Sequence, residues 1–362
     1  MAEAARWALV GFDRTRPPWE ALLCEGLPDE RGHAYLIKLH HALGDGLATA
    51  QLLEQLHTHT HTREPDPEVM PDPRPAARAS GLEALLGQVC HDVTTVPHLL
   101  TAATTGVLDA AGDPGAWVCR ATGYGQSLAR TLSPPDAPAS PLLTGRGAPW
   151  RFATLDVALP GLRAAAKAAG AILNDAFLAG LLGGYRRYHT GPGTPVEAIP
   201  MGVPISLRRG GDSGGGNRIA GARFLRPHRP HRPRAWIAAV RALILAARAE
   251  PAIDTISLIS PLLARLPGAV IARLVAPATA GNDLQAGLLP GPRTERYLAG
   301  ARVARVYPFA PLPGCPAMIT MVTHGKVGCV GVNYDPAAVT PPETFRRCLS
   351  DGFAEVLAVA AV

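Results

Sequence analysis

The stretch His40-His41-Ala42-Leu43-Gly44-Asp45-Gly46 most constrains what this chain can fold into, because it separates two runs of different periodicity. The residues 35–39 before it are typical of a β-strand, and residues 47–56 after it have the apolar spacing of a helix. A histidine pair that ends a buried strand can place one imidazole in a cavity, where it can take a proton from an alcohol or thiol. Gly44 and Gly46 permit backbone conformations that residues with a Cβ atom resist. The pattern predicts one catalytic imidazole facing an enclosed passage.

A lone histidine at a strand end is more often an ordinary polar residue. Other blocks of the chain favour the catalytic interpretation. They are Phe12-Asp13-Arg14-Thr15-Arg16-Pro17-Pro18-Trp19-Glu20, Leu173-Asn174-Asp175-Ala176, Pro204-Ile205-Ser206-Leu207-Arg208, Gly216-Asn217-Arg218, Leu289-Pro290-Gly291-Pro292 and Tyr297-Leu298-Ala299-Gly300-Ala301. Together with the His-His-x-x-x-Asp-Gly pattern, and in this order, the blocks resemble the bacterial wax ester synthase/diacylglycerol acyltransferase family of the CoA-dependent acyltransferase superfamily.

The resemblance implies an α+β fold of two subdomains, similar to chloramphenicol acetyltransferase, with mixed sheets flanked by helices. A chain of 362 residues is long enough for two cores. We expect residues 1–140 to form a partial N-terminal subdomain that carries the histidine motif, and residues 141–362 to form the C-terminal subdomain. Family members carry a longer segment before the block that begins here at Phe12, so we expect the N-terminal subdomain to be incomplete.

The resemblance also implies roles for individual residues. His41 would be the general base, His40 would orient it or line the tunnel, and Asp45 would complete the catalytic motif by holding the loop through an ion pair with Arg208. The residues implied to bind substrate or support the site are Gly46, Asn174, Asp175 and Asn217. Asn174 stands where a helix is expected to begin, so it has an alternative role as the helix N-cap.

The implied reaction is acyl transfer from a long-chain acyl-CoA to the hydroxyl of diacylglycerol or a fatty alcohol, which makes triacylglycerol or wax ester. Acyl-CoA would be a co-substrate, and no metal or other cofactor is expected. Three alternatives stay open: a condensation domain acting on another acceptor, a small-molecule acetyltransferase, and a non-catalytic lipid-binding or degenerate remnant of the family.

Composition limits the partners. A net charge of +6 suits weak attraction to CoA phosphates or an anionic membrane surface and does not favour nucleic acid. The six cysteines form no Cys-x-x-Cys pair and the N-terminus does not have the pattern of a secretory signal, so we expect a cytoplasmic protein, with peripheral contact to a membrane or lipid droplet as a further option. Residues 253–278 are apolar but broken by Pro261 and Pro267 into two short helices, which suit core packing or the membrane interface. Nothing in the sequence indicates the oligomeric state.

Periodicity and turn residues predict the remaining elements. Strands are expected at 7–10, 34–39, 150–159, 196–205 and 219–225, helices at 47–56, 82–108 and 162–169 and from Asn174, and a hairpin at 318–334 that turns at His324-Gly325. Residues 63–78, 133–149, 210–216 and 226–234 are expected to be connectors. His57, His59 and His61 are predicted to form a solvated helix exit in preference to a metal site.

Overall fold

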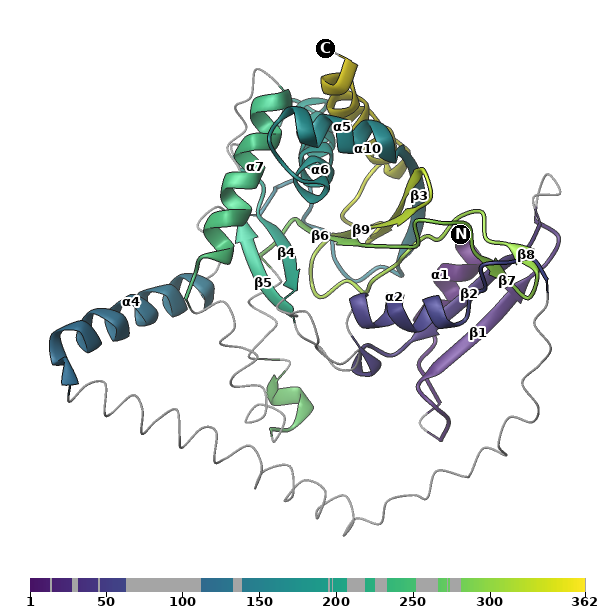
Figure 1. The fold of residues 1–362 in the computed structure, drawn as a ribbon, viewed down its shortest axis with the longest axis horizontal. Coiled ribbons are helices and arrows are strands. Elements are labelled where there is room, and N and C mark those ends of the chain that lie inside the picture. The colour runs from purple at the N-terminus through teal and green to yellow at the C-terminus, as the bar shows by residue number, and fades with distance from the viewer. Residues whose placement is uncertain are drawn as a thin grey trace, which may run out of the picture.

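We describe the fold from a computed structural model, which defines most of both halves of the chain. The structure describes residues 1–13, 15–27, 32–44, 46–62, 112–132, 139–194, 196, 198–206, 219–224, 233–251, 266–271, 273 and 281–361. Helices and mixed sheets alternate along it (Figure 1), so the predicted α+β class is confirmed.

A six-stranded mixed sheet organises the C-terminal half, in the order β3-β10-β9-β6-β4-β5. The strands are β3 (Arg151–Ala158), β4 (Met201–Ser206), β5 (Ile219–Phe224), β6 (Leu284–Leu289), β9 (Ala317–His324) and β10 (Val327–Tyr334). β6 runs parallel to both of its neighbours, β4 and β9, whereas the other pairs are antiparallel. β9 and β10 form the predicted hairpin, in which Gly325 adopts a positive φ of 57° at the turn, as glycine does readily.

Helices cover one face of this sheet (Figure 1). They are α5 (Leu159–Ala168), α6 (Leu173–Thr190), α7 (Pro233–Arg248) and α10 (Pro342–Leu357), followed by the short η3 (Ala358–Ala361). α6 is buried along most of its length and packs on α10 and α7. Their apolar side chains meet those of alternate strand residues, such as Met201, Leu284 and Ile319, in one hydrophobic core.

The N-terminal part is a smaller unit below the other face of the sheet in Figure 1. It contains α1 (Ala2–Leu9), the antiparallel pair β1 (Trp19–Cys24) and β2 (Ala34–Leu39), the single turn η2 (His41–Leu43) and α2 (Gly46–Gln55). Lys38 of β2 joins this strand to β1 and α1: its Nζ forms an ion pair with Glu20 at 2.7 Å, donates to the carbonyl of Val10 at 2.9 Å and lies 4.9 Å from the ring centroid of Trp7. A short pair, β7 (Tyr297–Leu298) and β8 (Ala301–Arg302), lies beside this unit.

Most predicted elements within the described residues are confirmed, and one is wrong. Residues 7–10 were expected to form a strand, but residues 7–9 end helix α1. Four residues carry too little periodicity to decide, whereas the alanines of this segment and the ion pair between Glu3 and Arg6, three residues apart, favour a helix. β4 starts at Met201, later than predicted. The segments 63–78, 82–108 and 210–216, and most of 253–278, lie outside the described residues.

Three long helices were not predicted at all. They are α4 (Pro114–Leu132), α10 and α7, which begins at Pro233, inside the segment 226–234 that was expected to be a connector. The signal for α7 was present, because Trp236, Ile237, Val240 and Ile244 recur at helical spacing and are all buried. The run of prolines before it obscured that spacing.

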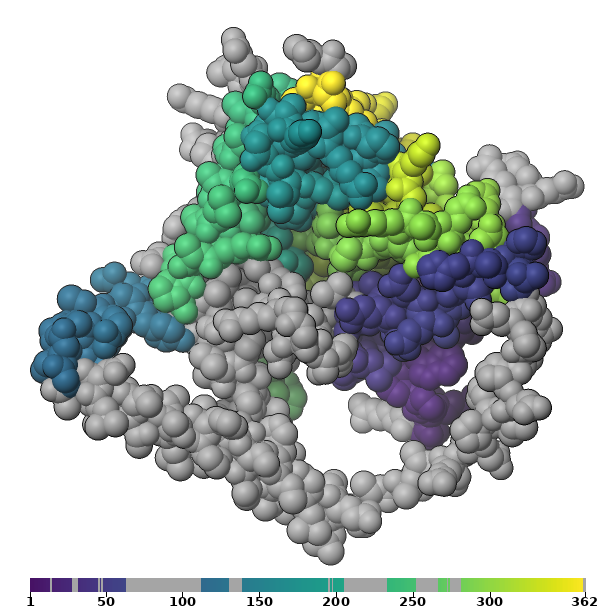
Figure 2. Space-filling view, in the orientation of Figure 1, coloured from purple at the N-terminus to yellow at the C-terminus, as the bar shows by residue number. Residues whose placement is uncertain are grey.

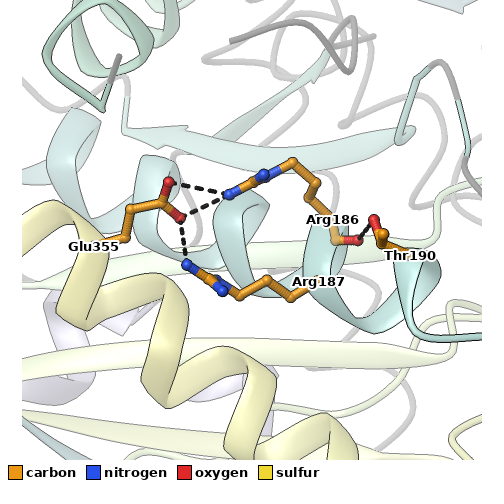
Figure 3. A network of polar contacts seen from close by, with 4 residues as sticks. All are labelled: Arg186, Arg187, Thr190 and Glu355. Atoms are coloured by element: carbon orange, nitrogen blue, oxygen red, sulfur yellow. Dashed lines mark hydrogen bonds and ion pairs between the residues drawn. The ribbon is translucent and has the colours of Figure 1, made fainter. Parts of the chain in front are cut away.

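α6 and α10 approach each other closely because glycines face each other at their crossing. A Cβ atom on Gly352 would collide with the backbone of Gly184 and with the carbonyl of Gly180. At one end of the same crossing, Glu355 accepts from Arg186 at 2.8 and 3.0 Å and from Arg187 at 3.2 Å (Figure 3). These ion pairs are part-exposed, so we assign the stability of the crossing mainly to its packing.

We predict that Gly352→Ala lowers the free energy of unfolding by about 1–3 kcal/mol or more, because backbone atoms cannot move aside for the added methyl group. Gly123→Ala is the matched control. Gly123 also lies inside a helix, α4, but among the described residues no atom outside the backbone of that helix stands within 4 Å of its missing Cβ, so alanine should raise stability by roughly 0.5–1 kcal/mol. Urea unfolding of both variants measures the difference. Equal effects of the two changes would contradict the close crossing.

Candidate active site

The upstream block Phe12–Glu20 contacts the histidine motif at His40. The His40 backbone N–H donates to the carbonyl of Pro18 at 2.9 Å, and its ring lies edge-on to Phe12 with centroids 5.8 Å apart. Its Nδ1 accepts from the backbone N–H of Ala42 at 3.1 Å, which makes His40 the N-cap of η2. His40 therefore fixes the turn after β2, and its Nδ1 lone pair is used in doing so.

His41 is the first residue of η2, and its side chain is exposed. We expected it to face an enclosed passage, and this expectation is wrong for the structure as described. The physical reason lies in the short turn, whose packed side is formed by Gly44 and Ala48 while residues 41–43 are exposed. His41 is thus positioned by its neighbours but accessible from solvent.

The motif glycines act through close packing and not through unusual backbone angles. Gly44 has an extended φ of 168°, which any residue adopts, but a Cβ atom there would stand 2.7 Å from Cβ of Ala48. A Cβ atom on Gly46 would stand 2.7 Å from Cδ2 of Leu289 on β6. The backbone role that we predicted for these glycines is corrected accordingly. Gly46 lets the first turn of α2 approach the C-terminal sheet.

The other end of α2 is tied to the same half of the protein. Arg296, which is almost fully buried, donates to the carboxylate of Glu54 at 2.7 Å and also contacts Nδ1 of His59. Thr58 and Tyr297 exchange two backbone hydrogen bonds, at 2.9 and 3.0 Å. Figure 2 shows α2, in dark blue, lying directly along the green surface of the C-terminal half. His59 and His61 are exposed and His57 is half-buried, so the predicted helix exit is solvated at two of its three histidines.

Asn174 and Asp175 lie in the first turn of α6, far from the histidine motif in the sequence. The helix starts at Leu173 with Ile172 as its N-cap, so the proposed N-cap role of Asn174 is wrong. Asp175 performs that function instead: its buried carboxylate accepts from the N–H of Ile172 at 3.0 Å and lies 3.4 Å from Arg241 of α7. An aspartate at the third helical position can reach back to the N-cap, which the sequence pattern did not distinguish from a cap at Asn174.

Three of the predicted site residues, Asp45, Arg208 and Asn217, lie outside the described residues. The ion pair between Asp45 and Arg208 therefore stays a prediction. Among the residues that the structure does describe, no three His, Cys, Asp or Glu side chains gather as metal ligands would.

A buried polar cluster in the C-terminal half was missed by the sequence reasoning. Asp283 is fully buried and both of its carboxylate oxygens accept from the backbone N–H of Ser140, at 2.9 and 3.0 Å. Ser140 Oγ lies 2.7 Å from Nε2 of His189, whose Nδ1 contacts the carbonyl of Tyr185 at 2.7 Å. Burial raises the pKa of Asp283 to about 6. The cluster links the segment before β3 to α6 and β6. Its members lie far apart in the sequence and come together only in the fold, so no sequence pattern indicated it.

Two family models match this chain. The catalytic domain of wax ester synthase/diacylglycerol acyltransferase matches residues 4–177, and the C-terminal domain of the same family matches residues 216–356. The chain belongs to the wax ester synthase/diacylglycerol acyltransferase family. The two matched regions are separated by the segment between residues 177 and 216. We expected the two subdomains to divide near residue 140, and that boundary stays a prediction.

Relatives of known sequence and structure agree with this family. A Mycobacterium tuberculosis protein, provisionally named a diacylglycerol O-acyltransferase, is 37% identical over 360 residues, covering 96% of this chain and 71% of that protein. A second one from the same organism is 26% identical, covering 98% and 74%. The wax ester synthase/diacylglycerol acyltransferase structure from Marinobacter aquaeolei VT8 superposes with a TM-score of 0.61 at 16% identity, covering 100% of this chain and 76% of that one. The first condensation domain of the calcium-dependent antibiotic synthetase gives a TM-score of 0.50 at 14% identity, covering 91% and 64%. The two structures show the acyltransferase fold.

Among the described helices of this family member, none alone is long and apolar enough to cross a bilayer. Of the helix pairs within the described ranges, only α5 and α6 taken together, bent by 100° at the break between them, have the necessary length and composition.

We predict that Asp175→Ala lowers the free energy of unfolding by about 1–3 kcal/mol, since it removes a helix cap and leaves Arg241 without its carboxylate. Asn174→Ala, one residue earlier, should change stability by less than about 0.5 kcal/mol. Thermal or chemical unfolding of the two variants compares them. A larger loss for Asn174→Ala would contradict the assignment of the cap.

We also predict a pH-dependent difference between Asp283→Asn and the unchanged chain. The unfolded carboxyl has an ordinary pKa near 3.8 and the folded one is raised to about 6, so the folded protein binds more protons between these values. The contribution of Asp283 to stability therefore falls as the pH rises from about 4 to 7, by roughly 3 kcal/mol. Asparagine does not titrate, so the variant should gain that amount relative to the unchanged chain over the same window. A difference in unfolding free energy between the variant and the unchanged chain that stays constant from pH 4 to 7 would contradict the raised pKa.

Proposed function

We propose that this protein transfers the acyl group of a long-chain acyl-CoA to the hydroxyl of a lipid alcohol, with His41 as the general base. The family supports acyltransferase chemistry. The observation that supports the residue assignment is the structural role of His40: its Nδ1 caps η2 and its ring packs edge-on with Phe12, so this residue positions the turn. Both histidines are exposed, and the family resemblance assigns the base to His41, the second of the pair.

The proposed reaction proceeds without a covalent enzyme intermediate. The unprotonated ring nitrogen of His41 takes the proton of the acceptor hydroxyl as that oxygen attacks the thioester carbonyl carbon. The tetrahedral intermediate collapses when the carbon–sulfur bond breaks, and the CoA thiolate leaves and takes the proton from the imidazolium. The products are one ester and one CoA thiol. General-base action of this kind is typically worth about 10²–10⁴-fold in rate, and orientation of the two substrates supplies much of the rest.

Diacylglycerol and long-chain fatty alcohols are the proposed acceptors, by analogy with the family name and with the relatives named as diacylglycerol O-acyltransferases. In this scheme acyl-CoA is a co-substrate and no other cofactor takes part. Such lipids reside in membranes and droplets, so we propose peripheral contact with a lipid surface on the cytoplasmic side. The exposed Trp117 and Val118 of α4, a helix without acidic residues that projects from the body in Figure 1, support that contact.

An exposed base also has a consequence for side reactions. Water can reach His41, and thioester hydrolysis then competes with acyl transfer until bound lipid excludes the solvent. We expect hydrolysis of acyl-CoA to be detectable without an acceptor and to decline when one is added.

The test uses labelled palmitoyl-CoA with either dioleoylglycerol or hexadecanol. We predict that His41→Ala lowers kcat/KM for ester formation by about 10²–10⁴-fold while the melting temperature stays within a few degrees, because the side chain is exposed. His33→Ala is the matched control, since His33 is also exposed and flanks the other end of β2. Full activity of the His41 variant would reject the assignment. Lipid binding by the unchanged chain without ester formation would favour the non-catalytic alternative.

A further inference from the structure

The two faces of the six-stranded sheet differ in a way that the proposed reaction does not use. Alternate residues such as Met201, Leu284 and Ile319 face the helices and form the core. The residues between them face the N-terminal unit. Gly202 pairs with Gln285, and Gly287 pairs with Thr320, so these four residues are directed to that second face. Leu289, which contacts Gly46 of α2, lies on the same face.

Thr320, near the middle of this face, carries a hydroxyl that makes no hydrogen bond within the described part of the chain. The residue is 5% exposed, and its Oγ1 is buried with no hydrogen-bond partner among the described residues. On the same face, Oδ1 of Asn282 is likewise buried without a partner there, and the Asn282 side chain lies over Gly202. A buried hydroxyl without a partner costs free energy, so its retention requires an explanation outside the fold.

Gly287 lies directly opposite Thr320 on the neighbouring strand, and described contacts do not require a glycine there. A Cβ atom would meet Cγ of Pro204 and Cγ2 of Thr320 at 3.7 Å, and Oγ1 of Thr320 at 3.9 Å, which are ordinary contact distances. Gly331, on the other side of Thr320, differs, because a Cβ atom there would collide with the carbonyl of Pro308. A strand glycine without a packing reason is typical of a place where a ligand approaches the backbone.

We propose that Gly287 and Thr320 form a subsite for the carbonyl group of an acyl lipid, in which the hydroxyl of Thr320 donates to the carbonyl oxygen. This inference rests on the proposed function. The atoms nearest to the position of a Cβ on Gly287 are the ring of Pro204 and the methyl and hydroxyl of Thr320, so the immediate contacts are apolar except for that one hydroxyl. That combination suits a carbonyl at the end of a hydrocarbon chain and does not suit a phosphate, which needs several donors or positive charge.

The subsite is also placed within reach of the histidine segment. Leu289, which packs against Gly46, lies two residues from Gly287 on β6, a distance of about 7 Å along a strand. A diacylglycerol whose ester carbonyl binds there can extend its free hydroxyl toward the turn that carries His41, whereas a thioester carbonyl bound there must itself lie beside that turn. The carbonyl could belong to the thioester of acyl-CoA or to an ester of diacylglycerol, and hexadecanol offers no carbonyl at all.

Thr320→Val tests the subsite, because it removes the hydroxyl and keeps the shape. We expect its urea midpoint to stay equal or to rise, since no hydrogen bond within the protein is lost, and kcat/KM to fall roughly five- to thirty-fold. Thr320→Ser should restore most of the activity. Thr323→Val is the matched control on the same strand: Thr323 Oγ1 accepts from the N–H of Gly291 at 2.9 Å, so this variant should have a lower urea midpoint.

The choice of acceptor distinguishes the two carbonyl sources. A loss of activity with both dioleoylglycerol and hexadecanol assigns the thioester, and a loss with dioleoylglycerol alone assigns the ester. Unchanged kinetics with both acceptors, or a lower urea midpoint for Thr320→Val, would overturn the subsite. If the unchanged chain makes no ester, the proposed function fails, and a binding assay tests the subsite instead. Weaker binding of fluorescent palmitoyl-CoA or fluorescent diacylglycerol by Thr320→Val then supports the subsite, and equal binding of both overturns it.

Discussion

The contact between Gly46 and Leu289 is the constraint on which the rest of the structure depends. Because residue 46 has no side chain, the first turn of α2 can rest on the end of β6, and the histidine turn that precedes it is held against the C-terminal half. Arg296 fastens the other end of the same helix through Glu54. A short helix held at both ends gives the preceding turn a defined position, although the turn itself has few buried residues.

β6 contributes residues to both faces of the sheet, the one that packs on the helices and the one that meets the N-terminal unit. Its residues Leu284 and Ala286 are fully buried against the helices, while Gly287 and Leu289 belong to the face that meets the N-terminal unit. The close crossing of α6 and α10 makes the helix layer compact, and the buried cluster around Asp283 fixes the segment that leads into β3. The strand that contacts the histidine segment is therefore built on a tightly packed core, as a site that must hold two substrates in register requires.

Much of this arrangement could be predicted from local sequence. The alternation in β3, the hairpin of β9 and β10 and the strand–turn–helix order around His41 each follow from signals within ten or so residues, and the family resemblance supplied their assembly. What depends on contacts between distant segments could not be predicted. The steric role of Gly46 and the burial of Asp283 beside Ser140 are set by partners 243 and 143 residues away. The capping role of Asp175 depends on a partner only three residues away, but there the sequence pattern alone favoured Asn174. The exposure of His41 likewise reflects which elements pack on the turn, and the motif itself carries no information about them.

The central claim is that the histidine turn and the second face of the sheet together receive the acyl donor. The most direct measurement is a crystal structure of this protein with a palmitoyl-CoA analogue in which a methylene group replaces the thioester sulfur, so that the carbonyl is kept but cannot be transferred. Our account predicts that the ketone lies between the ring of His41 and the strands β6 and β9. An analogue bound with its carbonyl remote from both His41 and this face would contradict it.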